Sequence, residues 1–383
     1  MGEEIHENNG LQAITEAANH FATSFLKVLV GDKSNNLIMS PLSVQVVLAM
    51  AAYGANGKTA TQMRSALLLP DNDSLGQSGY RSLITLLNFM FQTAKGVELR
   101  LANKIFTASG FAVKSTYKEL MTAKFLSSSQ EVDFGDASTA AKTINTWCEE
   151  QTNNRIKDVI TPNSICADTK LVLVNAVYFK GQWERKFDPS RTQDRPFYVD
   201  EKTTKHVPTM CIKHKFRMQA LPELDASFIE LPYQGGELSM IIILPNKIVN
   251  GLKTIEDNLH EVNLKERLQQ ISLRDVVVYL PKFKIECSLD LQNTLIKLGM
   301  TEMFTNGADF SGIAEFSLKV SKVVQKAFIE VNEEGTEAAA FTKMQITRRC
   351  GPREFEVNQP YYYAIYHRNT GISLFNGIVQ QPN

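Results

Sequence analysis

The sequence predicts an α+β fold, organised as one large domain over residues 1–383. Three observations support this prediction. Apolar residues recur at helical spacing in the first third of the chain, whereas continuous apolar runs typical of buried strands begin at Leu171. The length alone would allow two or three domains, but no low-complexity linker, repeat or step in composition marks a boundary.

Helices are predicted where apolar residues return every three or four positions. The first is built around an apolar face formed by Ile14, Ala17, Ala18, Phe21, Phe25 and Leu29. Two more are predicted over Ser43–Tyr53 and Ser82–Gln92. The strands predicted after this helix-rich third are bounded by Gly, Pro or Asp and comprise Leu171–Phe179, Leu238–Leu244 and Val276–Leu280.

Residues 333–349 combine the alternation of a strand with a protease cleavage signal at their end. One face would hold residues that suit burial, namely Thr336, Ala338, Ala340, Thr342, Met344 and Ile346. The other would carry residues that suit solvent or light cover, namely Glu337, Ala339, Phe341, Lys343, Gln345 and Thr347. No proline precedes Pro352, so the segment could pair on both sides as a central strand. Arg348 and Arg349 then offer trypsin-like enzymes a cation for an acidic specificity pocket.

The stretch Glu333-Glu-Gly-Thr-Glu-Ala-Ala-Ala340 resembles the reactive-loop hinge of an inhibitory serpin. Further serpin-like signatures run along nearly the whole chain: Asn36-Leu-Ile-Met-Ser-Pro-Leu-Ser43, Asn145-Thr-Trp147, Leu173-Val-Asn-Ala-Val-Tyr-Phe-Lys-Gly-Gln-Trp183, Leu280-Pro-Lys-Phe-Lys284, Phe355-Glu-Val-Asn-Gln-Pro-Tyr361 and Leu374-Phe-Asn-Gly377. On these motifs the chain is identified as a member of the serpin family, similar to its arthropod members. The resemblance implies a serpin fold with three β-sheets, about nine helices and an exposed reactive-centre loop over about residues 333–354.

The resemblance also implies roles for residues of this loop. Arg349 lies fourteen residues after Gly335, the spacing at which serpins place the scissile bond, so the reactive bond is expected at Arg349-Cys350. Protease contacts are expected from Arg348, Thr347 and Ile346. Ile346 departs from the basic residue that furin-type enzymes prefer, which favours a trypsin-like target. The insertion hinge is expected over Glu334, Gly335, Thr336, Glu337, Ala338, Ala339 and Ala340.

A polar cluster gates the main sheet in serpins, and four residues match it: Ser40, Ser43, Asn175 and Gln325. Many serpins carry a histidine where this chain has Gln325, before Lys326-Ala-Phe328. A glutamine can donate and accept hydrogen bonds together but does not titrate. The gate is therefore predicted to survive without the pH sensitivity that a histidine would give it.

The predicted function is inhibition of trypsin-like serine proteases by a suicide-substrate reaction. The target would form a covalent acyl-enzyme at Arg349, and the cleaved loop would insert into the main sheet. The alternative is a non-inhibitory binding or carrier protein of the same fold. Such members tend to carry bulky or charged hinge residues, and the face of this hinge that suits burial, with Thr336, Ala338 and Ala340, shows no such defect. A catalytic function is not predicted: no H-E-x-x-H or G-x-S-x-G motif occurs, and a Cys-His hydrolase built on Cys148 has no motif behind it.

Composition restricts the partners and the location. Lys+Arg and Asp+Glu both number 41, so no net charge favours nucleic acid or an anionic membrane, and the longest strongly apolar run is too short to span a bilayer. The polar, acidic N-terminus does not look like a signal peptide, which leaves a cytoplasmic protein or a mature secreted form. The prediction is a secreted, extracellular monomer, expected in haemolymph and innate immunity, with a glycosylation sequon at Asn72.

Two further features have a simpler and a functional interpretation. The densest basic cluster includes Lys213, Lys215 and Arg217, which either form a solvated face or contact a heparin-like glycan. Cys350 follows the predicted scissile bond and is either a tolerated residue or a redox-sensitive one. The five cysteines are odd in number and lack C-x-x-C spacing, which argues against a zinc site or a disulfide framework. No required cofactor is predicted.

Overall fold

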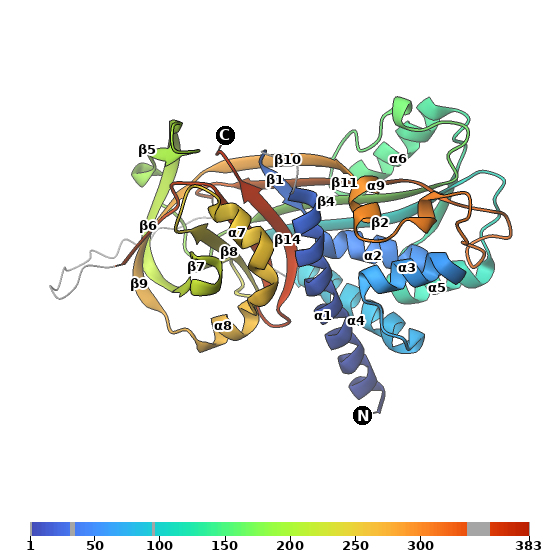
Figure 1. The fold of residues 1–383 in the computed structure, drawn as a ribbon, viewed down its shortest axis with the longest axis horizontal. Helices are drawn as coiled ribbons and strands as arrows, with labels where there is room; N and C mark the ends of the chain where they lie inside the picture. The colour runs from blue at the N-terminus through green and yellow to red at the C-terminus, as the bar shows by residue number, and fades with distance from the viewer. Residues whose placement is uncertain (1, 31–34, 94–95, 335–352, 383) are drawn as a thin grey trace.

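Three β-sheets and nine α-helices form the described part of the chain, which in this computed structural model comprises residues 2–30, 35–93, 96–334 and 353–382 (Figure 1). The helices are α1 (Gly2–Val30), α2 (Pro41–Ala52), α3 (Gly57–Leu67), α4 (Asp73–Thr93), α5 (Ser115–Phe125), α6 (Ala137–Gln151), α7 (Gly251–Asn258), α8 (Leu264–Gln270) and α9 (Gln292–Lys297). Short 3-10 turns occupy Pro162–Ser164, Pro189–Arg191, Pro222–Leu224, Leu259–Glu261 and Glu302–Phe304.

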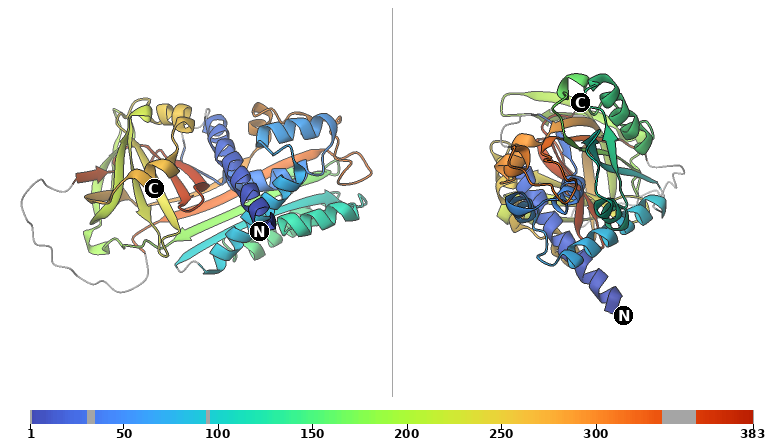
Figure 2. Two further views of the ribbon diagram at one scale, coloured as in Figure 1. Left: turned by 90° about the horizontal axis from the view of Figure 1, so that it is seen from below. Right: turned by 90° about the vertical axis from the view of Figure 1, so that its right-hand side faces the viewer.

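A five-stranded sheet runs along the long axis of the molecule (Figure 2, left). Its strands lie in the order β10 (Phe283–Asp290), β11 (Val320–Val331), β4 (Leu171–Gly181), β2 (Val97–Ala108) and β3 (Ser129–Val132). β11 and β4 run parallel, as do β2 and β3, whereas the other neighbours are antiparallel. The sheet therefore has a parallel pair at its centre.

The other two sheets are joined through the long strand β6 into nine hydrogen-bonded strands. β6 pairs with β9 over residues 209–216 and with β7 over residues 217–221. The strands are β1 (Leu37–Met39), β14 (Ile372–Val379), β13 (Tyr361–His367), β8 (Leu238–Pro245), β7 (Ala226–Pro232), β6 (Thr204–Leu221), β9 (Arg274–Pro281) and β12 (Arg353–Glu356), with β5 (Gln193–Tyr198) on the free side of β6.

β4 is buried from Leu171 to Phe179 because helices cover both faces of its sheet. Leu173 and Val177 belong to the larger apolar core, which includes α2. Val172 and Val174 belong to a second core with α6. Figure 1 shows α6 above this sheet and α2 and α3 below it. Continuous burial explains why the sequence of β4 is an unbroken apolar run rather than an alternating one.

The helices and strands predicted from periodicity are confirmed. The helical face from Ile14 to Leu29 lies within α1, Ser43–Tyr53 overlaps α2, and Ser82–Gln92 lies within α4. The three predicted strands correspond to β4, β8 and β9. Within the described ranges, every helix is either too short or too polar to cross a membrane.

Candidate functional site

The boundary between β4 and β11, here called the seam, is the parallel pair at the centre of the five-stranded sheet. Its register runs from Leu171 opposite Val320 to Phe179 opposite Ile329, with one irregularity near Val320 and Lys322. Two parallel neighbours can each accept an antiparallel strand between them, and antiparallel pairing is slightly more stable per residue. The seam is thus a place where an extra strand could be added with gain of hydrogen bonds.

A row of amide side chains crosses the seam. Asn103 of β2 lies opposite Asn175 of β4, which lies opposite Gln325 of β11. Beneath this row α2 begins, with Ser40 as its N-cap and Pro41 in its first turn. The Ser40 side chain accepts a hydrogen bond from the backbone N–H of Ser43 at 3.3 Å, which fixes the start of the helix.

The hydrogen bonds of this polar row connect all four elements. Gln325 Oε1 accepts from the backbone N–H of Ser40 at 2.9 Å, while its Nε2 donates to the Ser40 carbonyl at 3.0 Å and to Asn175 Oδ1. Asn175 Nδ2 donates to both Ser43 Oγ and Asn103 Oδ1. Ser40 Oγ donates to the carbonyl of Leu374 at 2.6 Å, which links the row to β14.

The row lies deep in an apolar core. Ser40, Asn175 and Gln325 are fully buried and Ser43 is 1% exposed. Buried polar groups of this kind stabilise a structure only while their partners remain in place, and each group left unpaired costs about 1–3 kcal/mol. The four residues predicted from the sequence are therefore brought together. Asn103 was not predicted, although an asparagine between Leu101 and Ile105 on the apolar face of β2 is a signal in the sequence.

Ion pairs anchor the chain where it leaves β11. Glu333 contacts Lys282 Nζ at 2.7 Å and accepts a hydrogen bond from Thr192 Oγ1 at 2.7 Å. Glu334 lies 3.5 Å from Lys180 of β4. Burial alone would raise the pKa of Glu333, but the hydrogen bonds from Lys282 and Thr192 outweigh it and lower the pKa. Both carboxylates hold the start of the predicted hinge beside the end of the seam.

An aromatic contact closes the same end of the seam. The indole N–H of Trp183 donates to the carbonyl of Asn332 at 2.9 Å. The ring of Trp183 stacks on Tyr233 with centroids 4.6 Å apart. Tyr233 also meets Phe179, the last fully buried residue of β4. These contacts connect the ends of β4 and β11 to the segment that follows β7, next to the start of the predicted hinge.

Most of the predicted loop lies outside the described residues. This applies to the hinge residues Gly335, Thr336, Glu337, Ala338, Ala339 and Ala340 and to Ile346, Thr347, Arg348, Arg349 and Cys350. The predicted loop region continues to residue 354, and its last two residues, Arg353 and Glu354, begin β12, which pairs in parallel with β9. The described chain therefore defines both attachment points of the loop.

The remaining predicted sites lie on the surface. Asn72 is exposed, and its Oδ1 accepts from the backbone N–H of Leu75 at the start of α4. This bond uses the oxygen, whereas glycosylation joins the sugar to the amide nitrogen. In the basic cluster of β6, Arg217 is engaged internally, because it pairs at 2.9 Å with Glu230, a carboxylate that is 2% exposed.

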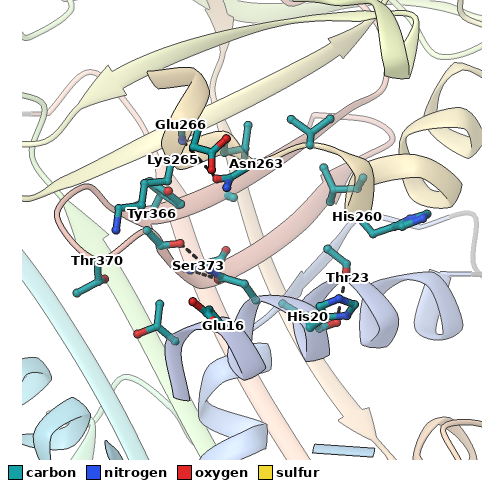
Figure 3. Close-up of a pocket in the computed structure, with 18 of the residues that line it drawn as sticks. Glu16, His20, Thr23, His260, Asn263, Lys265, Glu266, Tyr366, Thr370 and Ser373 are labelled. Atoms are coloured by element: carbon teal, nitrogen blue, oxygen red, sulfur yellow. Dashed lines mark hydrogen bonds between the residues drawn. The ribbon is translucent and has the colours of Figure 1, made fainter. Parts of the chain in front are cut away.

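A pocket of about 890 Å³ lies away from the seam, between α1, the segment from Leu259 through α8, and β13 with β14. Figure 3 shows Glu16 and His20 of α1 on one side and His260 and Lys265 on the other. Its lining mixes polar and apolar side chains. A pocket of this size bears on the alternative carrier function.

Comparison with known proteins places residues 16–382 in the family described as "Serpin (serine protease inhibitor)". An antitrypsin of Bombyx mori is 37% identical over 94% of this chain and 92% of its own length. Serpin B6 of Pongo abelii is 38% identical over 97% of this chain and 100% of its own length. The crystal structure of Serpin48, a highly specific serpin of the insect Tenebrio molitor, matches with a TM-score of 0.84 and 33% identity, over 97% of this chain and 99% of that one. The predicted fold is confirmed.

Proposed function

The chain belongs to the serpin family, and we propose that it inhibits trypsin-like serine proteases by a covalent suicide-substrate reaction at Arg349-Cys350. The closed seam carries this proposal, because it combines a parallel strand pair with a polar row that a competing strand can displace. The inhibitor names of relatives such as antitrypsin support the general class.

In the proposed reaction the catalytic serine oxygen of the target attacks the carbonyl carbon of Arg349. The bond to the Cys350 nitrogen breaks, that nitrogen leaves as an amine with a proton from the enzyme's general acid, and an ester joins Arg349 to the protease. Arg348, Thr347 and Ile346 contact the enzyme upstream of the bond. The chain itself supplies no catalytic group, because it acts as the substrate.

The freed strand then enters the seam, antiparallel to both β4 and β11. Loop insertion in serpins is itself a standard example of strand addition. About a dozen new ladder hydrogen bonds at roughly 1 kcal/mol each give on the order of 10 kcal/mol, comparable with the stability of a whole domain. Thr336, Ala338 and Ala340 suit the buried face of the new strand because they are small and uncharged. Fast insertion traps the ester, and slow insertion lets the protease finish hydrolysis.

The polar row is proposed to keep the seam closed until cleavage. Ser40, Ser43, Asn175 and Gln325 act together, since Gln325 bonds both to the start of α2 and to Asn175 across the seam. The hinge begins at Glu334, which Lys180 of β4 holds at the mouth of the seam. Opening must break these contacts, so they set the barrier to insertion.

The proposed setting is extracellular, with a glycan at the exposed Asn72 and a single trypsin-like protease as partner. A cytoplasmic inhibitor is the alternative setting. Mass spectrometry of peptides around Asn72 from the native source decides between them, because N-linked glycans are added only along the secretory route.

The test is incubation with trypsin, followed by denaturing electrophoresis and mass spectrometry of the released fragment. We expect a band at the summed mass and a fragment that begins at Cys350. The variant Arg349→Ala should lose this band with trypsin, because the acidic specificity pocket no longer finds its cation. Unchanged trapping by Arg349→Ala would show that the scissile bond lies elsewhere.

The second candidate is a carrier protein that uses the pocket between α1, α8 and β13. It predicts cleavage by trypsin without a covalent complex. It also predicts a small ligand that co-purifies with the protein and is released when the fold is denatured. Native mass spectrometry before and after denaturation detects such a ligand.

A further inference from the structure

An aromatic pair crosses the seam on the face opposite the polar row. Tyr178 of β4 lies opposite Phe328 of β11, and their rings are stacked with centroids 5.4 Å apart and planes inclined by 18°. Tyr178 belongs to the core on the α6 side of the sheet, and Phe328 packs against that core. Asn175 and Gln325 instead bond to residues at the start of α2. The two strands are therefore joined across the seam on both faces.

Two cations flank the aromatic pair. Arg155, in the segment after α6, places its guanidinium carbon 5.5 Å from the centre of the Tyr178 ring. Lys284 of β10, the strand next to β11, places its ammonium nitrogen 5.2 Å from the centre of the Phe328 ring. Tyr178 is only 3% exposed, and a cation over a ring is attracted to its face. The stack thus extends from β10 across the seam to the segment after α6.

The pair lies between the polar row and the end of the seam at which the loop region begins. Both rings are three residues beyond the amides of the polar row along their strands, a distance of about 10 Å. Glu334, from which the loop region continues, lies 3.5 Å from Lys180 at this end. A strand that enters the seam from this end meets the aromatic pair before the polar row.

Separation of β4 and β11 breaks the aromatic contact. Neighbouring strands are about 4.8 Å apart, so a strand placed between these two moves them about 10 Å apart. Aromatic rings interact at centroid distances up to about 7 Å. The contact between the two rings is then lost, and its loss adds to the barrier against opening of the seam.

We propose that Tyr178 and Phe328 form a second closure of the seam, which an inserting strand must break before it reaches the polar row. This inference rests on the proposed function. Both are positioning residues that act on the rate of insertion, because they lie within the sheet. Aromatic pairs of this kind contribute about two- to tenfold to an equilibrium constant, so their loss should speed opening by a similar factor.

The test measures how fast the uncleaved protein takes up a synthetic peptide of residues 336–347, detected as a one-to-one complex by native mass spectrometry. The peptide supplies a strand without a protease. Tyr178→Leu should take it up about two- to tenfold faster than the wild type, whereas Tyr178→Phe keeps the ring and should match the wild type. Phe328→Leu should resemble Tyr178→Leu. The two effects should not multiply in the double variant, because either change alone removes the pair.

Phe106→Leu is the matched control. It removes a ring contact of the same core, the one with Trp147 at 5.7 Å, which joins β2 to α6 and does not cross the seam. It should leave the rate of uptake unchanged. Equal acceleration by Phe106→Leu would overturn the inference, and so would effects at Tyr178 and Phe328 that multiply, since looser packing of the core would then set the rate.

Failure of the inference and failure of the proposed function give different results. Uptake by the wild type at a rate that the Tyr178 and Phe328 variants leave unchanged refutes the second closure alone. A wild type that takes up no peptide and forms no covalent complex with trypsin refutes the proposed function. The pair is then only a core contact, which non-additive losses of stability in denaturant unfolding of the same variants would show.

Discussion

The two central strand pairs of the molecule, β4 with β11 and β8 with β13, are held together in different ways. β8 and β13 are antiparallel and almost wholly apolar, with Ile241 opposite Ala364 and Met240 opposite Ile365. β4 and β11 are parallel and joined at their middle by Asn175 and Gln325. Both pairs have a backbone ladder and buried apolar side chains. The seam adds directional bonds between buried side chains, and those bonds are lost when its two strands separate. In the proposed mechanism, this difference separates a sheet that keeps its strands from one that accepts a further strand.

The largest effect is expected from a charge placed on the inserting strand. Ala338→Glu puts a carboxylate on the face that becomes buried in the seam, and burying an unpaired charge costs several kcal/mol. We expect the variant to be cleaved by trypsin with at least about a tenfold loss of covalent complex per cleavage. Quantitative electrophoresis of complex against cleaved inhibitor measures the ratio.

Ala339→Glu is the matched control, because the same charge then lies on the opposite face of the strand. It should retain most of the trapping. If both variants behave alike, the insertion register inferred from the alternation is wrong.

A smaller effect is expected from the polar row itself. Gln325→Ala and Asn103→Ala should each reduce the free energy of unfolding by about 2–4 kcal/mol. The first leaves Asn175 Oδ1 and the backbone of Ser40 without a partner, and the second removes the oxygen that accepts from Ser43 and Asn175. Gln325→Ala alone also weakens the seam, since Asn103 lies on β2, which stays paired with β4. Chemical denaturation measures the first effect, and loss of inhibitory activity on prolonged warming measures the second.

Equal rates of activity loss on warming for Gln325→Ala and Asn103→Ala would contradict this expectation. That result would mean that global stability, and not the contact across the seam, limits premature insertion.

The smallest expected effect is a dependence of the free energy of unfolding on pH, and it should arise at β13 of the nine-stranded assembly. Burial lowers the pKa of His367 in β13 to about 4, and its Nδ1 lies 2.7 Å from Thr370 Oγ1. The folded state therefore favours the neutral ring. This stability is present above the unfolded pKa of about 6.5 and is lost as pH falls toward 4. Between pH 7 and pH 5 we expect a loss of about 2 kcal/mol.

Denaturant unfolding at the two pH values should show this loss in the wild type and not in His367→Asn. The exposed His206→Asn serves as the control and should keep it. A pH dependence that survives in His367→Asn would place the titrating group elsewhere. Gln325 does not titrate, so it adds no pH dependence to the stability of the seam.

The sequence was most informative where structure is local or repeated. Apolar periodicity located α1, α2 and α4 and the strands β4, β8 and β9. The pairing of these strands depends on contacts between distant residues, which periodicity does not contain. The number of sheets and the gate residues could be predicted only because the motifs resemble those of a known family. The junction of two sheets through β6 follows from its 18-residue length and its two partners.

The contacts that were not predicted share one property: each depends on a partner far along the chain. Asn103 joins the polar row because the register places it opposite Asn175. Arg217 belongs to a basic cluster in the sequence, yet it is bound to Glu230 on the neighbouring strand. Glu333 is anchored by Lys282 and Thr192. Local composition cannot distinguish such engaged charges from free ones.

The positions of the two tryptophans make intrinsic fluorescence sensitive to changes in the five-stranded sheet. Trp183 stacks on Tyr233 at the end of the seam and donates to the carbonyl of Asn332. Trp147, in α6, packs against Phe106 of β2 and lies beneath the ammonium group of Lys104. It belongs to the core on the α6 side of the five-stranded sheet, whereas Trp183 belongs to the larger core. Indole emission responds to stacking, hydrogen bonding and nearby charge, and movement of the sheet would alter these for both rings. Unlabelled protein mixed rapidly with a protease could therefore time the opening of the sheet by fluorescence alone.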